Sequence, residues 1–278
     1  MPARRPGGHR HCMTPRAPRY WPDRQAGGRR MGGAAQDGRG MPRTVDEVRA
    51  ALTTLRERRG YLLPHHGLMA VSSPALLAAY DATYTALTLT PRVLSEYDKE
   101  VVWLIILVST GEAIATHHLD RLKRAGGGVA EIEAATALAA WGDGASRFAF
   151  VGAHWSAHLP GYAPEAAYRR GLDALLELHG TARAVAEMGL AAAHQCHRRW
   201  DWLRVHIRGA CAAGAPEPAI AEALSLAMFP GGVPNFVDAC AHWREMILAG
   251  EVDATPPYRA WAEMTGQGGF DEVAGIAG

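Results

Sequence analysis

The sequence has few cysteines and no long apolar run. Its four cysteines form no Cys-x-x-Cys pair; they are Cys12, Cys196, Cys211 and Cys240. A chain of 278 residues with so little cysteine is not a disulfide-stapled secreted domain, so we expect a reduced, cytoplasmic compartment. The longest apolar run, Val101 to Val108, is far shorter than the ~20 residues of a membrane-spanning helix. We therefore expect no membrane partner.

Residues 1–40 nearly lack large aliphatic side chains and are rich in Arg, Gly and Pro. Such a segment buries too little surface to offset the entropy of ordering, so we expect a disordered extension. No apolar stretch follows Arg4-Arg5 or Arg29-Arg30, which argues against an export signal, and Met41 is an alternative start of translation. The segment carries nine Arg and two Asp, which leaves the remaining chain with 20 basic and 26 acidic residues. This mildly acidic remainder gives no support to a nucleic-acid partner.

Two segments of the chain match at a fixed offset of 88 positions. His118, Gly126, Gly144, Phe148 and Ala153-His154-Trp155 correspond to His206, Gly214, Gly232, Phe236 and Ala241-His242-Trp243. Twelve of the 38 positions from His118 to Trp155 are identical to their partners, and Tyr80 and Tyr168 extend the register upstream. The pattern predicts a tandem duplication of a helical unit. We expect a first repeat at 41–160, a second at 161–252 and a tail at 253–278.

Apolar spacing, caps and Gly or Pro breaks predict helices throughout both repeats. The expected helices span 45–59, 73–87, 95–125, 129–141, 146–157, 182–213, 218–228 and 234–248. Thr44 and Glu47 are placed as a capping box before the first. No segment alternates with period two for long enough to require a sheet, so the fold class is all-α. The tail from Asp253 loses its apolar periodicity after Trp261 and is expected to fray.

His118 and His206 are the candidate catalytic residues, because histidine transfers protons near neutral pH and the position recurs in register. A buried, hydrogen-bonded structural role is the alternative. We interpret the recurring His-Trp pairs at 154–155 and 242–243, and Tyr80 and Tyr168, as core packing. His194, Cys196, His197 and Asp201 lie close together, but their spacing matches no zinc signature, so we expect no metal.

Residues 60–250 resemble the carboxymuconolactone decarboxylase and alkyl hydroperoxidase D group. That family's repeat has a Glu, a helix of nineteen further residues to a His, then seven residues, a Gly and a helix with an Ile. Glu187, His206, Gly214 and Ile220 match this pattern, and Glu100 lies one position off the same spacing before His118. The resemblance implies an all-α fold of this type. It also implies a homo-oligomer, for which we expect a trimer.

Peroxidase members of the family carry Cys-x-x-Cys seven and four residues before the His, because disulfide exchange needs an attacking and a resolving thiol. Gly111 and Ile114 occupy these positions in the first repeat, and Arg199 and Trp202 in the second. The missing dithiol argues against peroxidase activity. Antioxidant activity of the peroxiredoxin or alkyl hydroperoxidase type stays an alternative, because the family carries that label.

The resemblance then favours the decarboxylase branch, with His-centred acid/base chemistry on a small organic acid or lactone and no cofactor. The candidate catalytic residues are His206, Glu187, Asp201, His118, Glu100 and Glu112. Arg199 is a candidate anchor for a substrate carboxylate, because its planar fork matches that group, and His117 and Trp202 are further candidate substrate contacts. Decarboxylases usually place a Glu four residues before the His, where this chain has Ile114 and Trp202. A non-catalytic helical scaffold that binds a ligand is the alternative from another class.

Overall fold

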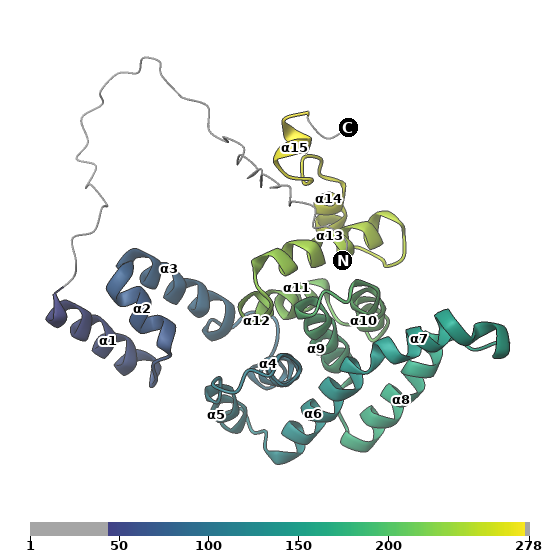
Figure 1. Ribbon diagram of the computed structural model, residues 1–278, viewed down its shortest axis with the longest axis horizontal. Coiled ribbons are helices and arrows are strands. Elements are labelled where there is room, and N and C mark those ends of the chain that lie inside the picture. Colours follow the sequence, from purple (N-terminus) through teal and green to yellow (C-terminus); the bar gives the residue numbers. More distant parts are fainter. Residues whose placement is uncertain (1–43, 276–278) are drawn as a thin grey trace, which may run out of the picture. The chain divides into compact units, whose positions relative to one another are not determined.

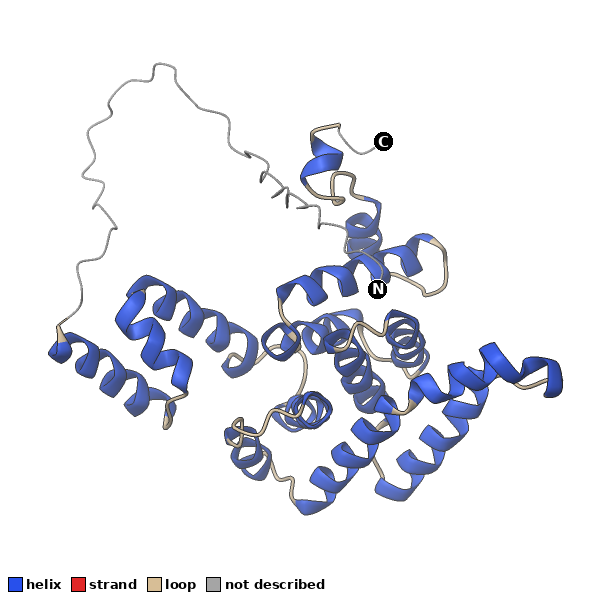
Figure 2. Ribbon diagram, in the orientation of Figure 1, coloured by secondary structure: helices blue, strands red, loops and turns tan. Residues whose placement is uncertain are grey.

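The computed structural model describes residues 44–275, and these residues form helices and no strand (Figures 1 and 2). The all-α prediction is therefore confirmed for this part of the chain. None of its helices is both long enough and apolar enough to cross a bilayer. The expected disordered extension at 1–40 lies outside the described residues.

The chain divides into two compact units between Ser73 and Pro74. The described part of the first unit contains α1 (Val45–Arg59) and α2 (Pro64–Ser72). The predicted capping box of α1 is present: the Glu47 amide donates to the Thr44 hydroxyl at 3.3 Å, and the Thr44 amide donates to the Glu47 carboxylate at 2.8 Å. Gly60 ends the helix with φ at 83°, a left-handed conformation that suits glycine.

The second unit holds the remaining helices. They are α3 (Pro74–Tyr84), the π-helix η1 (Thr85–Leu89), α4 (Glu96–Thr110), α5 (His117–Arg124), α6 (Val129–Asp143), α7 (Ala145–Trp155), the 3₁₀-helix η2 (Ser156–His158), α8 (Pro164–His179), α9 (Arg183–Cys196), α10 (Trp200–Ala212), α11 (Glu217–Leu226), α12 (Met228–Gly231), α13 (Val233–Leu248), α14 (Pro256–Glu263) and α15 (Phe270–Val273).

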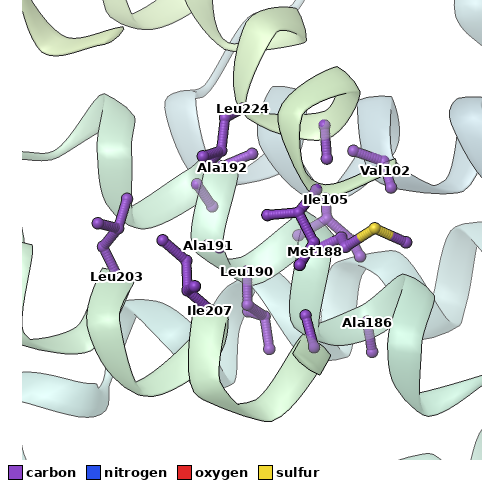
Figure 3. Packing of buried hydrophobic residues seen from close by; sticks show 14 of the residues in the cluster. Val102, Ile105, Ala186, Met188, Leu190, Ala191, Ala192, Leu203, Ile207 and Leu224 are labelled. Carbon is purple, nitrogen blue, oxygen red and sulfur yellow. The ribbon is translucent and has the colours of Figure 1, made fainter. Parts of the chain in front are cut away.

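The core of this unit forms where α4, α9 and α10 pack together. Both α4 and α9 are buried over most of their length, and α9 is rich in small residues such as Ala191 and Ala192. A Cβ on Gly189 would lie 2.5 Å from Ile105 Cδ1, so glycine at this position allows the two helices to approach closely. Figure 3 shows Ile105, Met188, Leu190 and Leu203 filling the space between these helices. The same helices carry four of the six candidate catalytic residues, namely Glu100, Glu187, Asp201 and His206.

Two predicted helices are each broken near the middle. The one expected at 95–125 ends at Thr110, because Gly111 takes a left-handed φ of 68°, and helix resumes at His117. The one expected at 182–213 ends at Cys196 and resumes at Trp200. Arg198 lies between them with φ at 57°, a conformation that is uncommon for a residue with a side chain. Tertiary contacts hold this second break, since the Asn235 side chain donates to the Cys196 carbonyl at 3.1 Å.

Two further expectations need correction. The helix expected at 73–87 changes after Tyr84 into the π-helix η1. The tail from Asp253, expected to fray, forms α14, which packs against α13 (Figure 1). Ala262 is completely buried, and its carbonyl accepts a hydrogen bond of 2.7 Å from Arg244 Nε. Periodicity in so short a helix is a weak signal, whereas the tertiary contact holds it in place.

Candidate functional site

The side chain of His206 lies between a carboxylate and a phenol. Its Nδ1 lies 2.6 Å from Glu187 Oε2 on α9, and its Nε2 lies 2.9 Å from Tyr168 Oη on α8. None of the three residues has any exposed surface. This chain of hydrogen bonds joins three helices that are separate in the sequence. We call Tyr168, His206 and Glu187 the second relay, because they lie in the second predicted repeat.

Two arginines hold the carboxylate of Glu187. Arg169 Nη1 donates to Oε1 at 3.1 Å, and Arg183 Nη1 lies 3.6 Å from the same oxygen. The Arg169 side chain is 26% exposed and also donates to the Val205 carbonyl, so it connects the buried carboxylate with the surface. Two guanidinium groups beside a buried carboxylate offset part of the cost of its burial. In the tautomer with the hydrogen on Nδ1, His206 donates to Glu187, and Nε2 accepts the Tyr168 hydroxyl hydrogen.

Gly209 makes room for this carboxylate. It follows His206 by one turn of α10, and a Cβ at this position would lie 2.3 Å from Glu187 Oε2. Glycine lowers helix stability, so its presence inside a helix needs a local reason. Here the reason is that the carboxylate lies directly against the α10 backbone.

Aromatic rings cover the phenol end of the second relay. Tyr168 contacts Trp202 at 4.6 Å, Phe148 at 5.6 Å and Trp141 at 5.8 Å between ring centroids. Burial raises the pKa of the Tyr168 phenol far above its usual value, and the Glu187 charge raises it further. The phenol is therefore neutral at any physiological pH and serves as a hydrogen-bond donor.

His194 stacks on the second relay, with its ring centroid 5.1 Å from that of His206 and an interplanar angle of 18°. It is 1% exposed, and neither of its ring nitrogens has a hydrogen-bond partner among the described residues. Burial, and then the neighbouring charge of His206, lower the pKa of His194 well below its usual value. His194 is thus a neutral ring that packs against the ring of His206.

The first predicted repeat contains a similar pair. His118 Nδ1 lies 2.6 Å from Glu100 Oε2, and Arg121 Nη1 lies 3.7 Å from Glu100 Oε1. The Trp103 ring lies 4.5 Å from that of His118. Tyr80, the tyrosine at the offset of Tyr168, packs on Phe229, whereas the hydroxyl of another tyrosine, Tyr84, lies 2.8 Å from Nε2 of the neighbouring His117.

Burial changes the pKa values of both Glu100 and His118. Burial raises the pKa of the Glu100 carboxyl to about 7, although Arg121 opposes the shift. Burial, and to a lesser extent the Arg121 charge, lower the pKa of His118 to about 3. His118 is therefore neutral, and Glu100 holds its proton up to about pH 7.

The remaining candidate residues lie around these pairs. Trp202 forms part of the aromatic wall, and His117 contacts Tyr84. Arg199 donates to Asp143 Oδ1 at 2.8 Å at the break between α9 and α10. Asp201 and Glu112 are exposed, and neither side chain has a hydrogen bond or an ion pair with His118 or His206. The structure thus brings Glu187 to His206 and Glu100 to His118, but it does not bring Asp201 or Glu112 to them.

Sequence reasoning missed the part that Tyr168 takes in the second relay. It also missed two residues beside the relay, Arg169 and His194. Tyr168 is expected only as core, although its recurrence at the fixed offset from Tyr80 was a signal. Arg169 follows it directly, and no local pattern marks it as a partner of Glu187. His194 is weighed only as a metal ligand, and the described residues contain no group of three or more His, Cys, Asp or Glu able to hold a metal ion.

Comparison with known proteins assigns a family to the segment that carries the second relay. Residues 166–245 match the carboxymuconolactone decarboxylase family, and this range contains Tyr168, Glu187 and His206. No curated protein and no solved structure matches the chain. The family match lies within the second predicted repeat, so the tandem duplication stays a prediction.

Proposed function

We propose, from the family to which residues 166–245 belong, that this protein is a carboxymuconolactone decarboxylase-like lyase acting on a small organic acid or lactone. The observation that carries the proposal is His206 held between the Glu187 carboxyl group and the neutral Tyr168 phenol. Such an arrangement suits proton transfer, because the carboxylate stabilises the imidazolium that forms and fixes the ring orientation.

In the proposed reaction the bond between a substrate carbon and its carboxylate breaks. Carbon dioxide leaves, the electron pair stays on the carbon, and that carbon takes up one proton. We assign Tyr168 as the donor: in this step His206 carries a hydrogen on each ring nitrogen, its Nε2 donates one to the Tyr168 oxygen as that hydroxyl gives its own to the carbon, and Glu187 stabilises the positive charge of the ring. His206 takes up a proton from water after the product leaves. No electron is gained or lost, so the step needs no redox partner.

Access to the hydroxyl requires movement. Tyr168 has no exposed surface, so a substrate reaches it only when a covering side chain moves aside. Trp141 and Phe148 are the partly exposed members of its aromatic wall. Arg199, the candidate carboxylate anchor, has to exchange its bond with Asp143 for one with the substrate.

A thiol peroxidase is a weaker proposal. Burial raises the pKa of the Cys196 thiol to about 12, and its Sγ lies against the Ala227 carbonyl. A thiol with so high a pKa is almost entirely protonated at neutral pH, whereas the attacking species is the thiolate. A non-catalytic scaffold is the second candidate, since both ring nitrogens of His206 already have partners inside the protein.

The deciding experiment is an assay of the full chain with carboxymuconolactone, followed by ultraviolet absorbance and by release of carbon dioxide. His206→Gln and Tyr168→Phe should each lower kcat by ~10²–10⁴-fold while the protein stays folded. His154→Gln is the matched control, because His154 is exposed on α7. Turnover that survives His206→Gln contradicts the acid/base assignment. If His206→Gln lowers only the melting temperature, and the native chain also releases no carbon dioxide, the scaffold is the better description.

A further inference from the structure

A cavity of about 180 Å³ lies between α11, α13 and α14, away from both His-Glu pairs. These three helices lie together in the second unit (Figure 1). The cavity is lined by Ala221, Leu224, Phe236, Cys240, Trp243, Tyr258 and Trp261. All of these side chains are apolar except for the phenol of Tyr258 and the thiol of Cys240, so the space offers almost nothing to a water molecule or an ion.

Three aromatic rings of the cavity lining are inclined to one another. Trp243 lies 5.4 Å from Tyr258 and 5.7 Å from Trp261, with interplanar angles of 38° and 66°. Tyr258 and Trp261 are nearly perpendicular, at 88°. Aromatic pairs favour such edge-to-face and offset arrangements, and a flat guest ring can form them with several walls at once.

The wall formed by α14 is fixed at both ends. At its start, the Thr255 amide donates to Glu217 Oε1 at 2.8 Å, and the Thr255 hydroxyl also bonds to Glu217. At its end, Arg244 Nε donates to the Ala262 carbonyl at 2.7 Å. A cavity whose walls are held in this way is already formed before a ligand arrives, so binding needs little reordering.

We propose that this cavity is a binding site for a small, neutral aromatic molecule. An apolar protein cavity of about 150 Å³ stays dry and accepts benzene, so the volume here suits a single substituted ring. The absence of a charged side chain from the lining argues against an ionic ligand, because a buried charge needs a partner. This site is separate from the second relay and does not depend on the proposed lyase activity.

Fluorobenzene is the probe that tests the proposal. Titrated into the full chain and followed by ¹⁹F NMR, it should bind saturably with a dissociation constant of about 1 mM, as expected for a ligand of this size. Ala221→Phe, which fills the cavity, should weaken binding at least tenfold. Ala140→Phe makes the same change at an exposed position of α6 and should bind like the native chain.

Alkylation of the native protein gives an independent readout that needs no folded variant. Cys240 lines the cavity, whereas Cys211 does not. Saturating fluorobenzene should slow modification of Cys240 by N-ethylmaleimide several-fold and leave Cys211 unchanged, as measured by peptide mass spectrometry. Equal rates at Cys240 with and without the probe overturn the proposal. Tighter binding of tetramethylammonium than of fluorobenzene also overturns it, because the rings then form a cage for a cation.

Discussion

Replacement of Gly209 by Ala gives the most direct test of the second relay. In an ordinary helix this change is favourable by ~1 kcal/mol, because alanine has the higher helix propensity. At position 209 the added Cβ would lie 2.3 Å from Glu187 Oε2 and 2.4 Å from Cδ, far inside van der Waals contact. Either α10 or the Glu187 carboxylate has to move.

The carboxylate has little freedom to yield. His206 Nδ1 holds it at 2.6 Å and Arg169 Nη1 at 3.1 Å, and the side chain has no exposed surface. Disruption of a buried ion pair costs ~3–5 kcal/mol. After subtraction of the propensity gain, Gly209→Ala should destabilise the protein by ~2–4 kcal/mol. It should also lower turnover, because His206 loses the group that orients it.

Urea unfolding followed by circular dichroism measures the first effect, and the lactone assay measures the second. Gly67→Ala is the matched control, because Gly67 lies inside α2 and a Cβ there meets nothing within 4 Å. The control should leave turnover unchanged. If Gly209→Ala stabilises the second unit by ~1 kcal/mol, as in an open helix, the carboxylate does not lie against α10 and the reasoning is refuted.

Three further predictions follow from the two His-Glu pairs and the cysteines. His118→Gln should lower kcat less than His206→Gln, since His118 is neutral and pairs with a carboxyl that holds its proton; equal losses in the lactone assay mean that both pairs take part. Glu100 has its pKa raised from 4.5 to about 7, so its contribution to stability is complete below pH 4.5 and is lost as pH rises through 7. The loss of stability is at most ~3 kcal/mol. Glu100→Gln should remove this part of the pH dependence in melting curves between pH 4 and 9. A pH dependence identical to that of the native chain contradicts the raised pKa of Glu100. Replacement of all four cysteines by Ser should leave turnover within a few-fold, and a collapse of peroxide turnover on changing Cys196 alone would revive the thiol-peroxidase alternative.

Local signals predicted the helices well and the relay only in part. The capping box of Thr44 and Glu47 involves neighbours in sequence, and the structure has it as expected. The spacing from Glu187 to His206 was visible because both lie in one family pattern. By contrast, the hydrogen bond from Tyr168 to His206 spans 38 positions, and no local pattern encodes such a contact. The break at Arg198 was missed for the same reason, because a residue of another helix, Asn235, caps the end of α9.

The two His-Glu pairs take their arginine from different places. In the first predicted repeat, Arg121 comes from the same helix as His118 and lies 3.7 Å from Glu100. At the same offset the second predicted repeat has Gly209, and the guanidinium nearest to Glu187 comes instead from Arg169 on α8, at 3.1 Å. The glycine allows the carboxylate to lie against the helix backbone, and the separate arginine reaches it in hydrogen-bonding geometry. A closer, hydrogen-bonded guanidinium holds the carboxylate in a fixed position, and a carboxylate against Nδ1 can stabilise an imidazolium. In our proposal, the exchange of Arg for Gly at this position therefore favours His206 over His118 as the acid/base residue.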